Sequence, residues 1–227
     1  MKLAIVGYGK MGRLVEQHAP AFGFEVTAKF DEHDAITAER VTGVDAAIEF
    51  TAPAAAVGNI ETLCALRIPV VVGTTGWTQH LPHVRAVVER TGGALVWSPN
   101  YSIGVQVFFR VAAEAARMMA GVPEYEAWVW EIHHSAKKDA PSGTLEKLVA
   151  AMRAAGYAGR IDASSNRAGA HPGTHEIGFD SAADTITLRH TARSREGFAR
   201  GALRAAQWIA GKKGCYEFSE ILFGEAG

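Results

Sequence analysis

The segment Glu131–Thr144, with the sequence EIHHSAKKDAPSGT, gathers groups that can exchange protons and bind anions. Two adjacent histidines, two lysines and an aspartate precede a Pro-Ser-Gly-Thr run that is typical of a helix start. Histidine has an unperturbed pKa of about 6.5 and can transfer protons near neutrality, while lysine supplies a compact positive charge. Free N–H groups at a helix start favour anions. The segment therefore predicts an active site for a small anionic substrate.

A second chemical signal stands near the N-terminus, where KLAIVGYGKMG joins an apolar segment to a glycine-rich turn. Gly7 would permit the tight turn, Gly9 would let backbone approach a pyrophosphate, and Gly12 would allow close helix packing. Three glycines alone could be only a structural turn. An acid, Asp31, follows about 20 residues later, where a carboxylate accepts hydrogen bonds from the adenosine ribose. Together these features favour a dinucleotide site.

The residues around Asp31 bear on the form of the cofactor. Glu32 adds a second carboxylate, which would repel a 2′-phosphate, so we favour NADH over NADPH. Lys10 and Lys29 are nearby cations, which keeps NADPH as the alternative. The Asp31-Glu32 pair could also be merely a solvated turn.

Alternating apolar and amphipathic segments must position these groups. Strands are expected at 3–6, 24–30, 44–50, 69–72 and 94–97, and helices at 11–21, 54–66 and 81–90. This alternation predicts a parallel sheet with helices on both faces. About 15 residues separate the second and third strands, so that crossover should be truncated or irregular.

The pattern changes after Asn100. Helices are expected at 105–120, 144–155 and 201–210, and strands at 125–133, 174–180 and 185–192. In the first of these strands Trp128 and Trp130 share a face that could be core or interface, and His133 and His134 should point to opposite sides. The fold class is therefore α/β: an N-terminal Rossmann-like doubly wound parallel sheet with a second α+β domain.

Two further segments follow predicted strands of the first domain, where open α/β sheets bind ligands. GTTG at 73–76 could fix the nicotinamide ribose, and Asn100 in SPNYSIGV could contact the carboxamide. Ordinary turn chemistry is the alternative for both segments. Similarly, Ser142 could simply cap a helix. Arg167, His171 and the GTHEIGF strand could close over the site, or they could form a surface loop.

These segments together resemble the dihydrodipicolinate reductase (4-hydroxy-tetrahydrodipicolinate reductase) family of bacterial lysine and diaminopimelate biosynthesis. The motifs are GYGKMG, VVVGTTGW, SPNYSIGV, HHSAKKDAPSGT, GTHEIGF and RSREGFARGALRAAQWI, which span nearly the whole chain. The resemblance implies an oxidoreductase that uses NAD(P)H to convert 4-hydroxy-tetrahydrodipicolinate to tetrahydrodipicolinate. It also implies a homotetramer formed through the second domain. Alternatives are another Rossmann oxidoreductase acting on a different cyclic imine or amino acid, and a non-catalytic nucleotide sensor.

The resemblance also implies domains and residue roles. A dinucleotide-binding domain would span 1–101, completed by 195–227, and a substrate-binding and oligomerisation domain would span 102–194. His133 and Lys137 would be catalytic, one of them as proton donor. The implied substrate-binding residues, which would hold a small dicarboxylate, are His134, Gly143 and Thr144. The implied cofactor-binding residues are Gly7, Tyr8, Gly9, Lys10, Met11, Gly12, Asp31, Gly73, Thr74, Thr75, Ser98, Pro99, Asn100 and Tyr101.

Composition narrows the class of protein. The 227 residues carry a formal net charge of -1, which offers no basic surplus for nucleic acid or anionic membranes. Two cysteines, Cys64 and Cys215, lack the number and spacing of a disulfide framework or a metal site. We find no signal-peptide pattern and no apolar segment approaching the ~20 residues of a membrane span. The expected compartment is the cytoplasm, without a metal cofactor.

Overall fold

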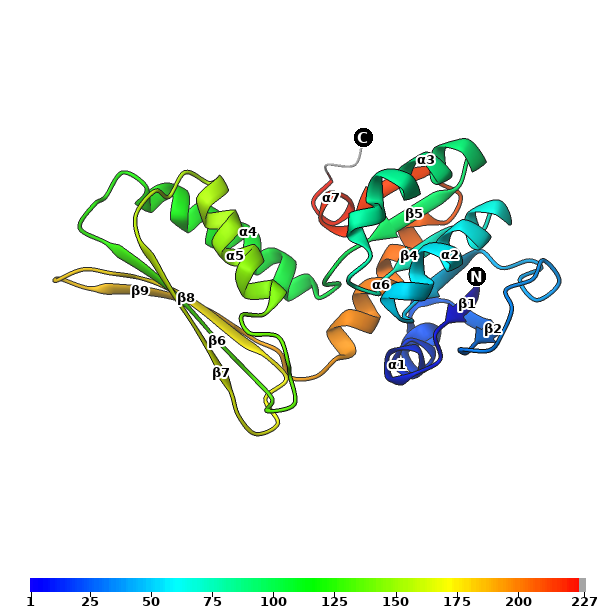
Figure 1. The fold of residues 1–227 in the computed structure, drawn as a ribbon, viewed down its shortest axis with the longest axis horizontal. Coiled ribbons are helices and arrows are strands. Elements are labelled where there is room, and N and C mark those ends of the chain that lie inside the picture. The colour runs from blue at the N-terminus through cyan, green and yellow to red at the C-terminus, as the bar shows by residue number, and fades with distance from the viewer. Residues whose placement is uncertain (225–227) are drawn as a thin grey trace. The chain divides into compact units, whose positions relative to one another are not determined.

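The computed structural model describes residues 1–224 and divides into two compact units (Figure 1). The first unit combines Met1–Ile103 with the chain from Glu196 onward. The second unit comprises Gly104–Arg195. The C-terminal part of the chain therefore completes the unit in which the chain begins.

A six-stranded parallel sheet lies at the centre of the first unit, in the order β10-β5-β4-β3-β1-β2. Its strands are β1 (Lys2–Val6), β2 (Glu25–Phe30), β3 (Ala46–Glu49), β4 (Val70–Val72), β5 (Ala94–Trp97) and β10 (Gly214–Glu217). Strands β3 and β4 are buried along their whole length. A parallel strand with both faces covered favours apolar residues, which explains the hydrophobic segments at 46–48 and 70–72, although β3 ends in the buried residue Glu49.

Helices cover both faces of this sheet. Alternate residues of β1 accordingly point into two different hydrophobic cores. Ala4 and Val6 belong to the core formed with α2 (Pro53–Ala65) and α3 (Leu81–Thr91). Leu3 and Ile5 belong to the core formed with α1 (Lys10–His18) and α6 (Glu196–Ile209). The unit also contains the short helix α7 (Phe218–Leu222) and the 3-10 turns η1 (Ala19–Phe22) and η2 (Thr78–His80). The expected doubly wound architecture is confirmed.

The connection between β2 and β3 departs from a regular doubly wound fold. Residues 31–45 form turns where a crossover helix would normally stand. An interval of this length is close to the shortest that can connect two parallel strands, which leaves little chain for a helix. The expected irregular crossover is thus confirmed.

The second unit contains a four-stranded mixed sheet in the order β7-β6-β8-β9. Its strands are β6 (Glu126–His133), β7 (Ile161–Arg167), β8 (Thr174–Asp180) and β9 (Thr185–Thr191). Strand β6 pairs with β7 in parallel and with β8 antiparallel. Two helices, α4 (Ile103–Met119) and α5 (Gly143–Ala154), cover one face and enclose an apolar core (Figure 1).

Three elements were absent from the sequence-based prediction. Strand β7, with the sequence IDASSNR, is a polar edge strand, so it lacks the apolar alternation of a strand with one covered face. Strand β10 is only four residues long and half-buried throughout, and α7 follows it directly.

Within the described part of the chain, every helix is too short or too polar to traverse a lipid bilayer.

Candidate active site

The glycine-rich turn of the first unit depends on two very close backbone contacts. A Cβ atom at Gly7, where φ is +92°, would lie 2.1 Å from the carbonyl oxygen of Phe50. A Cβ atom at Gly12 would lie 2.4 Å from the carbonyl oxygen of Gly7, so α1 can approach the turn only without a side chain there. Gly9, in contrast, faces open space at the start of α1. Its backbone can therefore be reached by a phosphate group, as the dinucleotide prediction requires.

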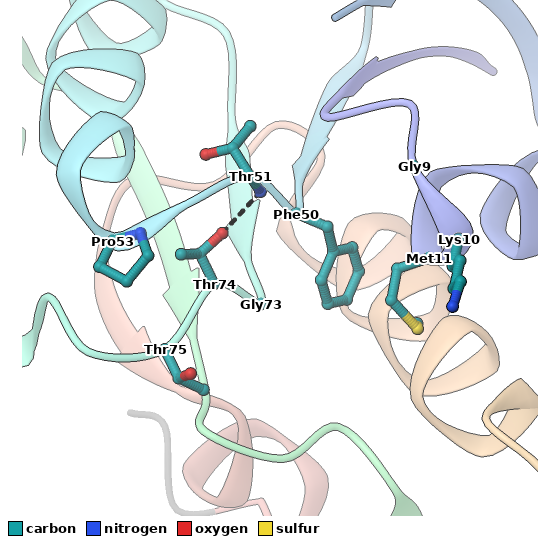
Figure 2. Close-up of a pocket in the computed structure, with 9 residues that line it drawn as sticks. All are labelled: Gly9, Lys10, Met11, Phe50, Thr51, Pro53, Gly73, Thr74 and Thr75. Atoms are coloured by element: carbon teal, nitrogen blue, oxygen red, sulfur yellow. Dashed lines mark hydrogen bonds between the residues drawn. The ribbon is translucent and has the colours of Figure 1, made fainter. Parts of the chain in front are cut away.

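A cavity of about 410 Å³ lies beside this turn, beyond the carboxyl ends of β1, β3 and β4 (Figure 2). Figure 2 shows Lys10 and Met11 on one side of it and Thr74 and Thr75 on the other. Its lining residues are Gly9, Lys10, Met11, Phe50, Thr51, Pro53, Gly73, Thr74 and Thr75. Phe50, Thr51 and Pro53 were not singled out from the sequence. Their position at the end of a predicted strand, or directly after it, was the signal that could have identified them.

Hydrogen bonds tie the cavity loops together. The Thr51 N–H group donates to Thr74 Oγ1 over 2.7 Å, and the Trp77 indole N–H donates to the carbonyl oxygen of Thr74 over 2.9 Å. A Cβ atom at Gly73 would lie 2.0 Å from the Phe50 ring, so the absence of a side chain there lets the ring pack across the cavity floor. The loops after β3 and β4 thus form one braced surface.

The 98–101 segment lies outside this lining. Ser98 Oγ donates to the Asn100 carbonyl oxygen over 2.8 Å, and Asn100 Oδ1 accepts from the Ser102 N–H group at 2.9 Å. Tyr101 is 1% exposed, and its hydroxyl lies 3.0 Å from the carbonyl oxygens of Val72 and Val96. The Tyr101 side chain therefore braces the ends of β4 and β5 in the core.

Tyr8 lies against a charged pair on the surface of the first unit. Its hydroxyl donates a short hydrogen bond to Glu16, and Lys29 Nζ donates to the same carboxylate over 3.0 Å. Lys29 Nζ also lies 4.7 Å from the centre of the Tyr8 ring. The Tyr8 hydrogen bond lowers the pKa of Glu16, with Lys29 as the second cause. Tyr8 and Lys29 are thus held in fixed positions beside the turn.

Asp31 begins the irregular crossover and is exposed. Its Oδ1 accepts from the Glu32 N–H group at 3.0 Å, and its own N–H group donates to Asp34 Oδ2 over 2.8 Å. Arg40, which sequence reasoning missed, pairs with Asp34 at 2.7 Å and stacks 4.2 Å above the Phe30 ring. The start of the crossover therefore gathers the carboxylates of Asp31, Glu32 and Asp34, and Arg40 is already paired with Asp34.

The second unit buries a carboxylate, Glu131, at the end of its sheet with 0% exposure. Its Oε1 accepts from the Ser142 N–H group at 2.9 Å, from Ser165 Oγ at 2.8 Å and from Arg167 Nη2 at 2.9 Å. Its Oε2 accepts a short hydrogen bond from Ser142 Oγ and lies 3.2 Å from His175 Nε2. Burial acts to raise the pKa of Glu131, but the bonds from His175, Ser142 and Arg167 outweigh it and hold that pKa well below its usual range.

His133, the last residue of β6, lies beside this carboxylate and is 8% exposed. Its Nδ1 is 3.4 Å from Glu131 Oε2, and its ring centre is 5.0 Å from that of His175. Burial lowers the pKa of His133 to about 4, although the Glu131 charge opposes this shift. A Cβ atom at Gly173 would lie 3.0 Å from His133 Nε2. The free protein therefore holds a neutral imidazole whose Nε2 faces a backbone without a side chain.

The remaining residues of the 131–144 segment take distinct places. Lys137 Nζ lies 2.7 Å from both carboxylate oxygens of Asp139, and this contact lowers the pKa of Asp139. The Arg167 guanidinium donates to the carbonyl oxygen of Asp139 over 2.5 Å. His134 follows the end of β6 and is half-buried, while Lys138 is exposed. Asp139 thus holds the Lys137 ammonium in place.

Helix α5 begins at Gly143, close to the Glu131 carboxylate. Ser142 is its N-cap, with Oγ accepting from the Leu145 N–H group at 3.2 Å, so the capping role expected of Ser142 is confirmed. Gly143 is exposed and faces open space, and Thr144 follows it in the first turn. The helix start is thus accessible to an anion. Arg167, which could have belonged to a surface loop, instead ends β7 and binds Glu131.

Glu131, His133 and His175 also bring three ligand-type atoms within 4.8 Å of one another. Zinc requires ligands at about 2.0–2.2 Å with free lone pairs. Here the Arg167 cation lies 2.9 Å from Glu131, and both carboxylate oxygens already accept hydrogen bonds. The cluster fits a hydrogen-bonded network rather than a cation site.

A glycine-rich turn and an open cavity at the carboxyl ends of a doubly wound parallel sheet are the features of a Rossmann-type dinucleotide-binding domain. Family models described as dihydrodipicolinate reductase, N-terminus and C-terminus, match residues 1–101 and 104–222. The chain belongs to the dihydrodipicolinate reductase family, a family of nicotinamide-dependent enzymes, as its motifs predicted.

Curated relatives match over almost their whole length. The chain is 35% identical to a 4-hydroxy-tetrahydrodipicolinate reductase from Christiangramia forsetii, with 98% of each protein covered. It is 33% identical to the enzyme of that name from Archaeoglobus fulgidus, with 98% of this chain and 100% of the relative covered. A dipicolinate-bound dihydrodipicolinate reductase from Paenisporosarcina sp. TG-14 has the same fold, with a TM-score of 0.82, 21% identity and coverage of 97% of this chain and 99% of that chain.

We predict that His133 titrates far below an ordinary histidine. Because burial lowers its pKa to about 4, the folded state favours the neutral ring, and stability should be lost as the pH falls from about 6.5 toward that value. NMR titration of the histidine Cε1–H signals, with His133→Asn to assign the resonance, measures this directly. A signal that titrates near the unperturbed value would contradict the structure.

Proposed function

We propose that this protein reduces 4-hydroxy-tetrahydrodipicolinate to tetrahydrodipicolinate, as the names of its relatives state for those proteins. The observation that carries the proposal is the position of His133 beside the buried Glu131, which also binds the cap residue at the accessible start of α5. Water leaves the hydroxylated ring, and a hydride and a proton are added to the resulting conjugated imine. A bound NADH or NADPH supplies the hydride and becomes oxidised.

The residues of the first unit fit this cofactor. The open backbone at Gly9 and the start of α1 would take the pyrophosphate, and the Thr74-Thr75 loop would take the nicotinamide ribose. The same proposal assigns the cofactor to the glycine-rich turn and to Asp31. The 98–101 segment would contact the cofactor through backbone groups, because the Tyr101 side chain is buried and its hydroxyl bonds to the carbonyl oxygens of Val72 and Val96.

The residues of the second unit would hold the substrate and supply the proton. The N–H groups and hydroxyl of Gly143 and Thr144 would bind one carboxylate, and His134 or Lys137 the other. His133 is neutral in the free protein, so it must gain a proton before it can donate one. A bound dianion would favour that protonation, because a nearby negative charge raises the pKa of an imidazole. Proton transfer contributes ~10²–10⁴-fold to such a reaction, and positioning of the dianion contributes further.

We predict that His133→Ala and Lys137→Ala each lower kcat by about 10²–10⁴-fold, because each removes a candidate proton donor or carboxylate contact. Binding of NADH should remain within about twofold, because the cofactor site lies in the first unit. The measurement couples enzymatically generated substrate to the loss of nicotinamide absorbance. Lys138→Ala, an exposed neighbour, is the matched control. A variant that retains wild-type kcat would remove that residue from the proposed chemistry.

We also propose a preference for NADH. Asp31, Glu32 and Asp34 gather negative charge on the crossover, where a 2′-phosphate would have to lie. Arg40 is the nearest structural candidate to bind such a phosphate, but Asp34 and the carbonyl oxygen of Lys29 already hold its guanidinium. A phosphate would have to replace these contacts.

We predict that Glu32→Arg shifts the ratio of kcat/KM values from NADH toward NADPH by at least about tenfold, through a charge-assisted bond to the 2′-phosphate. Steady-state kinetics with both cofactors test this. Glu39→Arg makes the same charge change on the same exposed crossover and is the control. Equal shifts in both variants would mean that overall charge, rather than a local contact, sets the preference.

A homo-oligomer formed through the second unit is the third part of the proposal. Trp128 and Trp130 are half-buried on the sheet face opposite α4 and α5. They line a cavity of about 420 Å³ with Val129, Asp162, Ser164 and Glu176. Exposed aromatic surface of this kind is typical of interfaces.

We predict that Trp130→Glu lowers the molecular mass in sedimentation experiments, because a charge would be buried in the proposed interface. Met118→Glu, on the exposed side of α4 with 62% exposure, should leave the assembly unchanged. An unaltered mass for Trp130→Glu would exclude this sheet face.

A further inference from the structure

We propose that Glu131 is a positioning residue that orients His133 and the first turn of α5 as one rigid group, with His175 as its second support. The inference rests on the proposed function, since it concerns the proposed proton donor and the helix start that would bind a substrate carboxylate. Glu131 itself would not touch the substrate. Its effect would pass entirely through the imidazole and the helix start.

The first argument comes from sheet register. Glu131 stands opposite Ser165 on β7 and His175 on β8, and His175 stands opposite His190 on β9. A row of polar side chains thus crosses all four strands at one end of the sheet. On the same buried face, the next rows along β6 and β8 are apolar, pairing Val129 with Ile177 and Ala127 with Phe179. An apolar row would have completed this core, so stability alone does not explain the polar one.

The second argument comes from the division of contacts between the two carboxylate oxygens. Oε1 is anchored to β7 by Ser165 at 2.8 Å and Arg167 at 2.9 Å. Oε2 faces His175 Nε2 at 3.2 Å and His133 Nδ1 at 3.4 Å. Ser142 bonds to both oxygens, through its N–H group and its hydroxyl. One carboxylate therefore fixes the helix cap to β6 and lies 3.4 Å from His133 Nδ1, a buried nitrogen that has no hydrogen-bond partner among the described residues.

The third argument is electrostatic. A carboxylate beside Nδ1 favours a proton on Nδ1, which leaves Nε2 as the nitrogen that exchanges a proton. Nε2 is on the side of Gly173, where a Cβ atom would lie only 3.0 Å from it, so the ring packs against backbone that carries no side chain. Three groups facing His133, namely His175, Lys137 and Arg167, disfavour the imidazolium, and Glu131 alone among its charged neighbours favours it. Removal of the Glu131 charge should therefore make the protonated donor harder to form.

The test compares Glu131→Gln, which removes the charge but keeps the shape, with Glu126→Gln, an exposed change on the same strand. We expect Glu131→Gln to lower kcat by about 10–100-fold or more, as loss of an orienting carboxylate does elsewhere. NADH affinity should stay within about twofold, and the limb of the pH profile that reports His133 protonation should move to lower pH. Glu126→Gln should match the wild type in all three.

A readout independent of turnover is the ¹⁵N chemical shift of the His133 ring nitrogens at neutral pH. The wild type should carry its proton on Nδ1, and Glu131→Gln should redistribute it toward Nε2. If Glu131→Gln fails to fold, His175→Gln replaces it, because that change leaves the Glu131–Arg167 ion pair intact. We expect His175→Gln to lower kcat by about tenfold and to alter the same nitrogen shifts.

Wild-type kcat within about threefold together with unchanged His133 nitrogen shifts in the folded variants would overturn the positioning role. Absence of any reduction by the wild type would instead reject the proposed function. The nitrogen shifts would still show whether Glu131 sets the state of His133.

Discussion

The buried charge of Glu131 is the interaction on which the second unit depends. An ionised carboxylate with no exposure to solvent is stable only when hydrogen-bond donors replace its water. Those donors come from β7, β8 and the cap of α5, so satisfying one side chain draws three elements to a common point. The same requirement explains why β7 is polar: its Ser165 and Arg167 face a charge rather than an apolar core.

The first unit meets a different constraint, which is steric. Backbone must pass so near to backbone at Gly7 and Gly12 that no side chain fits, and the Phe50 ring must cross Gly73. These close contacts leave the start of α1 and the loops after β3 and β4 as a preformed surface. The first unit is thus organised by close backbone packing, and the second by a network of charged side chains.

Much of this organisation could be predicted from the sequence because it follows from local signals. Apolar runs identified the buried strands, the glycine spacing identified the turn, and Ser142 was recognised as a helix cap. The long-range partners could not be predicted in this way. Nothing near Glu131 in the sequence indicates that Arg167 and His175 bind it, since sheet pairing brings these residues together across more than one strand. Likewise Arg40 lies in a segment without periodicity, and only the coordinates place it on Phe30 and Asp34.

The irregular crossover at 31–45 has an evolutionary consequence. Its charged side chains are exposed and attached to turns, so substitutions there can accumulate without disturbing the hydrophobic interior. The polar row of the second unit has less freedom, because Ser165 and His175 bind the buried carboxylate of Glu131. Under the proposed cofactor preference, substitutions on this exposed crossover would change which nicotinamide nucleotide is used without altering the buried residues of either unit.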